Sequence, residues 1–419
     1  MKELYETQEQ PKRVFLVGIR DKRDQEETLQ ELAGLADTLG LEIAAQEIIY
    51  IRERHPKFGM GTGKAEELAE KAIAAEADCL IFDGELTPSQ QRNWETLTGI
   101  SAMDRQELII QIFASRAKTK EAELQVELAE RTYALPRLRH KYIDLSRQRG
   151  GRYGTKGSGE TKLETDRRLV EKRILTLERE LGEVRKNREV QRKKRERQGI
   201  HACALVGYTN AGKSSLLNAM TNADALVEDK RFATLDTTTR QLELGKGPPL
   251  LLIDTVGFIR RLPHTLVDAF RSTLEEAAQA DLLLHVLDAA DPEIDHYFET
   301  TLSVLRELKA DMIPMITVLN KVDCLSSEEA LQLLKKRYSD SIPISAKHGL
   351  GLEALIRRIE EHTSGKTTCF YFPPDRQDLP SLLYRKGKVI SKRYEDDGIE
   401  IEAQVSTAVQ EQLREYVRE

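Results

Sequence analysis

The chain has 419 residues, of which 40% are hydrophobic, 5% aromatic and 32% charged, and its formal net charge is −6. At roughly 100–200 residues per domain, this length predicts about two to four domains. The longest near-continuous apolar run, Leu282–Leu287, is interrupted by His285 and is far shorter than the roughly 20 residues of a membrane span. The segment Met1–Glu6 lacks the apolar core of a secretory signal. We therefore expect a cytoplasmic protein without a membrane span.

The cysteines and histidines show no metal-binding pattern. The four cysteines are Cys79, Cys203, Cys324 and Cys369, and no two of them have CxxC spacing. We expect them to be small, buried hydrophobic side chains in a reducing cytosol, and the histidines to have ordinary core or surface roles.

Residues 1–104 alternate short apolar runs with amphipathic stretches, which is the pattern of a small α/β domain. The expected strands are Val14–Gly18, Ile48–Ile51 and Cys79–Phe82, and the expected helices are Gln25–Leu39 and Ala65–Glu76. Because helices separate the strands, we expect a largely parallel sheet.

Residues 105–198 show a different pattern, in which apolar residues repeat at alternating spacings of four and three. The first series is Leu124, Leu128, Leu135 and Leu138, in which Arg131 fills one core position, and the second is Val170, Ile174, Leu177, Leu181 and Val184. Between them lies the glycine-rich segment Arg149–Gly159, which we expect not to be helical. Two helices with one apolar seam each predict an antiparallel helical hairpin. Pro136 is expected to kink or end the first helix.

Residues 199–364 again alternate strands with helices and predict a doubly wound α/β domain with mostly parallel strands. The expected strands are Ala202–Val206, Leu250–Ile253, Leu282–Leu287 and Met315–Leu319. Residues 365–419 are expected to form a small α+β domain. It would contain a hairpin of Val389–Lys392 with Ile399–Ala403, followed by a short helix.

In residues 199–364, the expected strand Ala202–Val206 is joined to the next helix by a sequence of the form GxxxxGK[ST]. It reads Gly207-Tyr208-Thr209-Asn210-Ala211-Gly212-Lys213-Ser214. Such turns place backbone N–H groups around phosphates, and the N-terminus of the following helix adds positive potential. Lys213 is expected to reach the β- and γ-phosphates, and the Ser214 hydroxyl to bind Mg²⁺. The segment predicts a P-loop nucleotide site.

A second motif, Asp254-Thr255-Val256-Gly257, ends the expected strand Leu250–Ile253. Asp254 can hold the Mg²⁺ shell there, and the Gly257 N–H can face a γ-phosphate. Alone this pattern is weak, but its position after the P-loop makes a nucleotide role the better interpretation.

Two further motifs are expected to determine which nucleotide base is bound. Asn320-Lys321-Val322-Asp323 follows the expected strand Met315–Leu319, and Ser345-Ala346-Lys347 follows a short apolar run. The Asp323 carboxylate can accept two N–H bonds from guanine, whereas adenine offers no such pair. Asn320 is expected to brace the loop, Lys321 to cover the ring, and the second motif to supply a backbone N–H for the guanine oxygen. Four motifs in this order predict a P-loop GTPase domain.

The segment Phe232-Ala233-Thr234-Leu235-Asp236 lies between the P-loop and Asp254. A threonine here is expected to contact Mg²⁺ only when the γ-phosphate is present, which makes the segment the first switch. Spacing alone does not choose among Thr234, Thr237, Thr238 and Thr239.

These motifs together resemble a translation-factor-related GTPase. Gly150–Glu164, followed by Thr165–Arg168, and Gly61–Leu68 resemble signature segments of the HflX family. The resemblance is strong over residues 12–363 and looser in the C-terminal part. It implies that Thr234 is the Mg²⁺-contacting threonine, although Thr237 stands where relatives usually carry proline. The residues expected to act in the reaction are then Lys213, Thr234 and Gly257, and the expected metal ligands are Ser214 and Thr234.

The resemblance also implies partners. Members of the HflX family bind the large ribosomal subunit, can split ribosomes and are linked to stress recovery. The glycine-rich tip of the hairpin is expected to enter ribosomal RNA near the peptidyl-transferase centre. We expect a monomer that binds GTP and GDP.

The residue after Gly257 is Phe258, where many small GTPases place a water-orienting glutamine. Because phenylalanine cannot orient water by hydrogen bonding and the P-loop contains no arginine, we expect slow intrinsic hydrolysis that accelerates when ribosome contact orders the switches. Asn210 resembles the asparagine that helps to hold K⁺ in potassium-activated GTPases. Its other interpretation is a residue that braces the loop, and the sequence leaves both open.

The charge is unevenly distributed. Residues 131–198 contain 22 lysines and arginines against 10 aspartates and glutamates, so this arm has net charge +12 and the rest of the chain −18. Its tip, Arg137–Lys156, also contains Tyr142 and Tyr153, which can stack on bases while the cations pair with phosphates. A solvated helix pair is the simpler interpretation, but its charges should be nearly balanced.

Gly59–Lys64 resembles a second phosphate loop, but its spacing departs from the GxxxxGK[ST] pattern, and a glycine turn into a helix explains it better.

The alternative function is a GTP-regulated protein that binds or remodels another structured RNA.

Overall fold

The computed structural model describes most of the chain. The described residues are 13–21, 29–148, 158–197, 200–221, 238–243, 249–259, 276–363 and 366–418, apart from residues 375, 377, 396 and 406. They divide into two compact units, residues 13–183 and residues 184–418. Within this part of the chain, no helix combines the length and apolarity needed to cross a bilayer.

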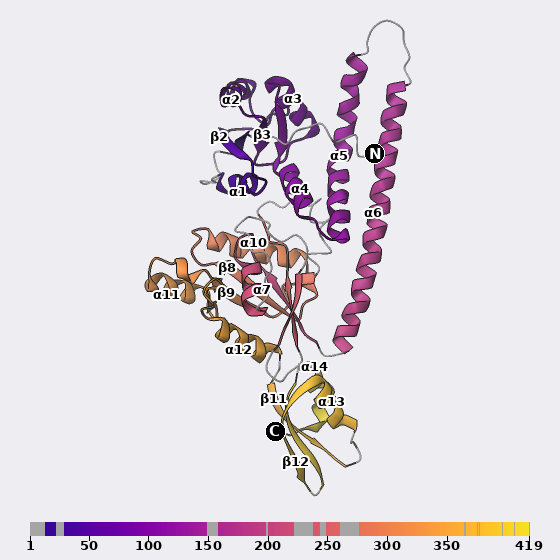
Figure 1. The fold of residues 1–419 in the computed structure, drawn as a ribbon, viewed down its shortest axis with the longest axis vertical. Helices are drawn as coiled ribbons and strands as arrows, with labels where there is room; N and C mark the ends of the chain where they lie inside the picture. Colours follow the sequence, from indigo (N-terminus) through magenta and orange to yellow (C-terminus); the bar gives the residue numbers. More distant parts are fainter. Residues whose placement is uncertain are drawn as a thin grey trace. The chain divides into compact units, whose positions relative to one another are not determined.

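The first unit begins with a four-stranded parallel sheet of order β2-β1-β3-β4 (Figure 1). Its elements are β1 (Arg13–Asp21), α1 (Gln30–Thr38), β2 (Glu42–Ile51), α2 (Thr62–Ala74), β3 (Cys79–Phe82), α3 (Pro88–Thr98), β4 (Ser101–Asp104) and α4 (Arg105–Arg116). Trp94 is 0% exposed in the core of this sheet, where it contacts Phe58 and Phe82. The parallel α/β prediction is confirmed.

Two long helices, α5 (Lys120–Gln148) and α6 (Ser158–Arg197), lie side by side (Figure 1). Leu124 packs with Leu177 and Leu181, and Arg173 donates to Glu127. Residues later in α5 therefore meet residues earlier in α6, so the pair is antiparallel, as expected.

Two details of the hairpin differ from the prediction. The helix α5 continues through Pro136, so of the two expected outcomes, a kink or an end, the end is excluded. The next residue, Arg137, is held by Leu86 and Asp104, and these bonds offset the backbone bond that proline cannot make. The helix α6 begins at Ser158, so Ser158 and Gly159 are helical although a non-helical segment was expected to extend to Gly159. Residues 149–157 of the tip lie outside the described residues.

The second unit contains a six-stranded sheet of order β10-β9-β8-β5-β7-β6, in which only β6 is antiparallel to its neighbour. Its elements are β5 (Ala202–Val206), α7 (Lys213–Thr221), β6 (Thr238–Leu242), β7 (Leu250–Asp254), β8 (Leu282–Asp288), α10 (Ile294–Glu307), β9 (Met315–Asn320), η1 (Val322–Cys324), α11 (Glu328–Arg337), β10 (Ile342–Pro343) and α12 (Leu352–Thr363).

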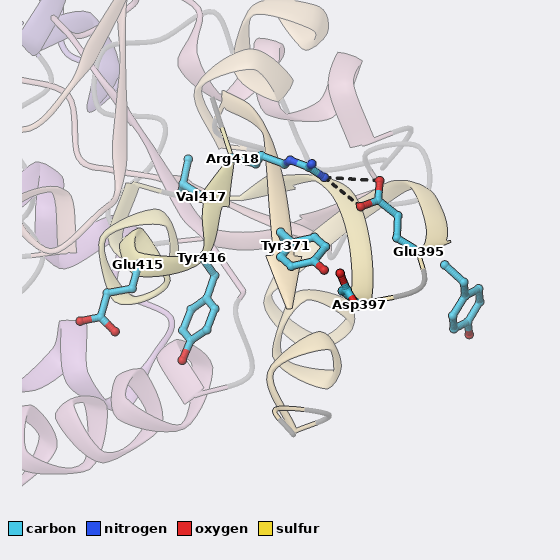
Figure 2. Close-up of a pocket in the computed structure, with 8 residues that line it drawn as sticks. Tyr371, Glu395, Asp397, Glu415, Tyr416, Val417 and Arg418 are labelled. Carbon is cyan, nitrogen blue, oxygen red and sulfur yellow. Dashed lines mark hydrogen bonds and ion pairs between the residues drawn. The ribbon is translucent and has the colours of Figure 1, made fainter. Parts of the chain in front are cut away.

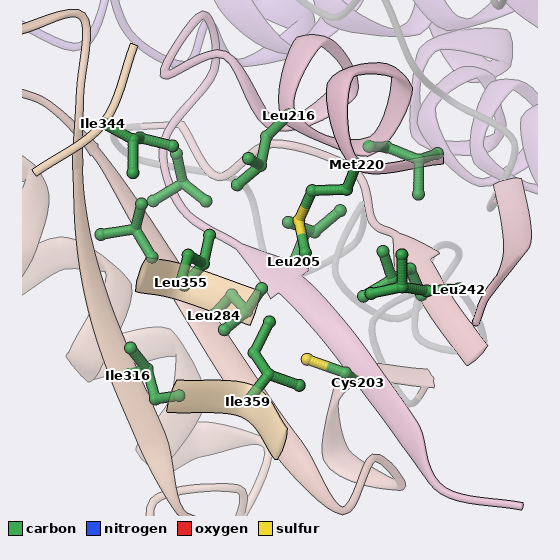
Figure 3. Packing of buried hydrophobic residues seen from close by; sticks show 14 of the residues in the cluster. Cys203, Leu205, Leu216, Met220, Leu242, Leu284, Ile316, Ile344, Leu355 and Ile359 are labelled. Carbon is green, nitrogen blue, oxygen red and sulfur yellow. The ribbon is translucent and has the colours of Figure 1, made fainter. Parts of the chain in front are cut away.

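Helices cover both faces of this sheet. On one face, Leu216 of α7 and Leu355 of α12 pack with strand residues such as Leu205 and Leu284 (Figure 3). On the other face, Ile294 of α10 packs with residues that include Leu287 and Leu319. Neighbouring residues of one strand point to opposite faces, so this is the doubly wound arrangement that the sequence predicts. The parallel strands place the loops after β5, β7 and β9 at one edge.

The C-terminal sheet is antiparallel, with order β12-β13-β11-β14. Its elements are β11 (Lys366–Phe372), α13 (Asp378–Lys386), β12 (Gly387–Glu395), β13 (Gly398–Val405), α14 (Thr407–Gln412), η2 (Arg414–Tyr416) and β14 (Val417–Arg418). The expected hairpin is present, with Val389 opposite Ala403 and Lys392 opposite Ile401. The structure adds β11 and α13, which the sequence analysis did not predict.

Candidate nucleotide site

The P-loop follows β5 directly and leads into α7. Its sharp turn depends on Gly212, whose φ is +89° and where a Cβ atom would lie 2.2 Å from Asn320 Nδ2. A side chain at this position would be both strained and obstructed. The loop therefore has the turn that brings backbone N–H groups to the start of a helix.

Lys213 is the first residue of α7 and is only 5% exposed. Its ammonium donates to the carbonyl oxygens of Gly207 at 3.0 Å and Tyr208 at 2.7 Å. Burial lowers the pKa of Lys213 to about 8, against the opposing influence of the Asp254 carboxylate. The side chain is thus folded back along the loop that a phosphate chain would follow.

Ser214 and Asp254 meet at the carboxyl end of the sheet. The Ser214 Oγ donates to Asp254 Oδ2 at 2.6 Å, and Asp254 is buried at the end of β7. Mg²⁺ prefers oxygen donors and is usually held by one or two protein oxygens together with phosphate and water. A hydroxyl and a carboxylate at the first turn of the helix fit this requirement, although no group of three or more His, Cys, Asp or Glu able to hold a metal occurs in the described residues.

Gly257 reaches the same place from the end of β7. A Cβ atom on Gly257 would lie 2.9 Å from Lys213 Nζ and 2.8 Å from Thr209 Cα. The backbone of Gly257 therefore lies directly against the P-loop lysine, and only glycine permits this approach. The structure thus brings together Lys213, Ser214, Asp254 and Gly257, which the sequence analysis assigned to one site.

The two motifs expected to bind guanine are joined to the P-loop through Asn320. Its Nδ2 donates to the carbonyl oxygen of Ala211 at 2.9 Å, and its Oδ1 accepts from the Ala346 N–H at 3.0 Å. Asn320 thus braces the site, as expected. In this structure, the Ala346 N–H points to Asn320.

Asp323 and Lys321 lie on the loop that follows β9. Hydrogen bonding from Ser345 holds the pKa of Asp323 below its usual value, against a small opposing effect of burial. Asp323 is therefore an ionised acceptor, as recognition of guanine N–H groups requires. Lys321 Nζ pairs with Asp288 Oδ2 at 2.6 Å, which was not anticipated.

The segment expected to form the first switch lies outside the described residues. It comprises Phe232, Ala233, Thr234, Leu235 and Asp236, and Thr237 lies outside the described residues as well. Thr238 and Thr239 belong to the edge strand β6, where Thr238 pairs with Asp254 and Thr239 with Ile253.

The chain is similar to known proteins along its length. Residues 26–114 match the family described as GTP-binding GTPase N-terminal, residues 116–195 the GTP-binding GTPase middle region, and residues 202–321 the 50S ribosome-binding GTPase family. The chain is 45% identical to GTPase HflX of Akkermansia muciniphila, over 100% of this chain and 99% of that protein. It is 41% identical to GTPase HflX of Escherichia coli K12, over 94% and 92% of the two chains.

The chain belongs to the HflX family of GTPases. It is accordingly a P-loop enzyme that hydrolyses GTP to GDP and phosphate. Among solved structures, it is similar to a GTP-binding protein of Sulfolobus solfataricus in complex with GDP, with 25% identity and a TM-score of 0.44 over 83% of this chain and 97% of that chain.

One feature of this HflX-family site was missed by the sequence analysis. The ring of Tyr208 in the P-loop stacks on Tyr297 of α10 at 3.9 Å, with 17° between the ring planes. Tyr297 in turn donates to Glu293 at 3.0 Å. The contact joins residues far apart in sequence. Tyr208 stands at an unspecified position of the P-loop pattern and Tyr297 in no motif, so the sequence does not connect the two.

A second unanticipated feature is a buried polar cluster that joins α5 to the N-terminal sheet. Tyr133 donates to Glu107 Oε2 at 3.0 Å, and Arg137 donates to Asp104 Oδ2 at 3.2 Å and to the carbonyl oxygen of Leu86 at 2.9 Å. Burial, with the neighbouring Asp104 carboxylate, raises the pKa of Glu107 to about 7. These bonds fix the direction in which the first helix of the hairpin leaves the sheet.

The glycine segment Gly59–Lys64 leads into α2, as the better interpretation predicted, but the helix begins at Thr62 and so already includes Lys64. Gly61 precedes the helix, and Lys64 Nζ donates to the carbonyl oxygen of Tyr50 at 2.6 Å. The lysine is thus tied to the neighbouring strand rather than to the turn, unlike a P-loop lysine.

The C-terminal sheet has an open cavity of about 840 Å³ (Figure 2). Tyr371 and Tyr416 line it together with acidic residues, and Arg418 pairs with Glu395 at 3.1 Å and Glu400 at 3.2 Å. Arg418 also lies over the Tyr371 ring, 5.2 Å from its centroid. These contacts tie the short strand β14 to the rest of the sheet.

Proposed function

We propose that this HflX-family GTPase binds the large ribosomal subunit and couples GTP binding and hydrolysis to the splitting or rescue of ribosomes under stress. The observation that carries the nucleotide half of the proposal is the convergence of Lys213, the Ser214–Asp254 pair and Gly257 at one edge of the sheet. The ribosomal half is supported by the match of residues 202–321 to the 50S ribosome-binding GTPase family and by the charge of the hairpin.

Each residue has a distinct task in the proposed site. The Lys213 ammonium would leave its backbone partners for the β- and γ-phosphates, Ser214 and Thr234 would bind Mg²⁺, and the Gly257 N–H would face the γ-phosphate. The bound Mg²⁺ would neutralise charge that develops on the phosphate oxygens. Asp254 would orient the metal shell by accepting hydrogen bonds.

Base selection is assigned to Asp323, with Asn320 holding the loop in place. The ionised Asp323 carboxylate would accept the two N–H groups on the Watson–Crick edge of guanine. Lys321, Val322 and the loop Ser345–Lys347 would enclose the ring. Adenine would leave the carboxylate without two donors, at a cost of roughly 1–3 kcal/mol.

Hydrolysis by the protein alone is proposed to be slow. The side chain of Phe258 is 2% exposed and has no group that can orient water. The missing interaction would come from a ribosomal group or from ribosome-induced ordering of the switches. GTP turnover at saturating nucleotide should therefore rise when large subunits are added, and equal rates with and without them would contradict the idea.

The basic hairpin is proposed to bind ribosomal RNA. Basic residues of α6 form ion pairs on the exposed surface of the helix. Examples are Arg167–Glu171 and Lys193–Glu189, which join exposed side chains one helical turn apart. Such pairs contribute little to stability and yield readily to a phosphate backbone. Close approach to RNA is assigned to the glycine-rich tip.

The deciding experiment is sedimentation with purified large subunits in the presence of a non-hydrolysable GTP analogue. Co-sedimentation that requires the analogue and is lost in Lys213→Ala supports the proposal. Binding to an unrelated structured RNA but not to the subunit would favour the alternative, a GTP-regulated RNA-binding protein.

The hairpin tip is tested in the same assay. Reversing Arg149 and Arg152 to glutamate should weaken subunit binding and flatten its salt dependence, because fewer phosphate counterions are released. Reversing Arg393 of β12 and Arg414 of η2, both in the C-terminal part of the chain, changes the net charge equally and should leave binding unchanged. Equal binding of the two double variants to the large subunit would contradict the proposed RNA contact of the tip.

A further inference from the structure

The P-loop and the residue that follows Gly257 are paired as if they continued the sheet. Beyond β7, residues 255–257 bulge, and Phe258 then forms a parallel bridge with Tyr208. The Thr209 N–H donates to the Phe258 carbonyl oxygen at 2.9 Å, and the Phe258 N–H donates to the Gly207 carbonyl oxygen at 3.1 Å. This pair of bonds is called the Phe258 clasp below.

The clasp determines where Gly257 lies. Immediately before the bridge, the backbone of Gly257 is pressed against the P-loop, so that a Cβ atom there would lie 2.8 Å from Thr209 Cα and 2.9 Å from Lys213 Nζ.

The side chain of Phe258 fixes the clasp to the protein interior. Its ring and the side chain of Ile259 are each 2% exposed. A buried ring of this size sets the path of its own backbone, because interiors are closely packed and a displaced ring would leave a void. Phe258, which cannot orient water by hydrogen bonding as a glutamine would, is thus an apolar anchor for this part of the backbone.

Many small GTPases carry a water-orienting glutamine at the position of Phe258, and the contacts of Phe258 indicate a different role. We propose that Phe258 is a positioning residue, whose buried ring and backbone clasp hold Gly257 beside Lys213, where the third phosphate of GTP binds. This inference rests on the nucleotide site proposed above. It follows that loss of the ring weakens binding of a nucleoside triphosphate far more than binding of GDP, which has no third phosphate.

The test compares affinities for GDP and for a non-hydrolysable GTP analogue in Mg²⁺ buffer. In Phe258→Ala, the Kd for the analogue should rise about tenfold or more, as expected for a lost hydrogen bond to a charged group, while the Kd for GDP changes less than about threefold. Phe258→Leu keeps an apolar anchor and should retain most of the discrimination. Ile316→Ala is the matched control, since Ile316 is 3% exposed in the same sheet and lies near the opposite end of β9.

Phe258→Gln separates the inference from the simpler idea that glutamine is merely missing. A polar side chain cannot replace the buried ring, so this variant should behave like Phe258→Ala. If Phe258→Ala unfolds, the pair Phe258→Leu and Phe258→Gln gives the same test, because both leave a smaller void and they differ in polarity.

Several outcomes would overturn the inference. They are a rise in intrinsic GTP hydrolysis in Phe258→Gln, an equal loss of GDP and analogue binding in Phe258→Ala, and the same shift in Ile316→Ala. A wild-type protein that binds neither nucleotide would instead contradict the proposed function.

Discussion

Asn320 donates its side-chain amide to the carbonyl oxygen of Ala211, which lies 109 positions earlier in the P-loop, at 2.9 Å. The other end of the same carboxamide accepts from the Ala346 N–H. One buried side chain therefore holds the phosphate-binding loop and the base-binding loop at a fixed separation. Both halves of a nucleotide must be accommodated at that separation, so damage to Asn320 should affect all guanine nucleotides alike.

Replacing Asn320 with alanine should weaken binding of GTP and GDP by similar factors. It removes two buried hydrogen bonds and leaves the Ala211 carbonyl and the Ala346 N–H without this partner, at about 1–3 kcal/mol each. Titration with both nucleotides and urea unfolding measure the effect. Asn93→Ala, which removes an exposed bond to the Lys57 carbonyl in the other unit, should change neither. A loss confined to GTP would contradict this bracing role.

Replacing Asp323 with asparagine should change which base is bound. The amide has one acceptor and one donor, so it can no longer accept two N–H bonds from guanine, and GTP affinity should fall about 100-fold. Xanthine has a carbonyl where guanine has its amino group, so xanthosine nucleotides should gain affinity. Competition between the two nucleotides measures the switch. Asp311→Asn, at an exposed position, is the control, and an unchanged preference would remove Asp323 from base recognition.

Asn210 has a φ of +64°, a conformation that asparagine tolerates better than most residues. That geometry suits a loop brace, while the exposed side chain suits a K⁺ ligand. Asn210→Gly distinguishes the two because glycine keeps the backbone conformation and removes the amide. We expect the wild type to hydrolyse GTP faster in KCl than in NaCl of equal ionic strength, and the variant to show no difference. Equal wild-type rates in both salts would leave only the bracing role.

Motif spacing predicted the nucleotide site because each motif directly follows a strand, and parallel strands bring their carboxyl ends to one edge. The approach of Gly257 to Lys213 follows from that topology. The Tyr208–Tyr297 stack and the Phe258 clasp do not, since both depend on how a helix or a bulge is placed in three dimensions. The continuation of α5 through Pro136 was not predictable for a similar reason, because the bonds of Arg137 that support the helix come from residues more than thirty positions away.

The pKa of Glu107 has a consequence for stability. Burial raises it from 4.5 to about 7, so between these values the folded protein binds more protons than the unfolded chain. The contribution of Glu107 to the free energy of unfolding is therefore most favourable below about pH 4.5, declines as the pH rises to about 7 and is constant above that. At 1.36 kcal/mol per pKa unit, the whole change is on the order of 3 kcal/mol.

Glu107→Gln should remove this pH dependence, because the amide resembles the protonated acid and can still accept from Tyr133. The variant should match the wild type near pH 4.5 and be more stable at pH 8 by on the order of 3 kcal/mol. Trp94 is the single tryptophan of the chain and is buried in the N-terminal core, so its fluorescence during urea unfolding reports on this sheet. Glu53→Gln, at an exposed position, should leave the profile unchanged. Parallel wild-type and Glu107→Gln profiles from pH 4.5 to 8 would show that the Glu107 carboxyl ionises as easily in the fold as in the unfolded chain.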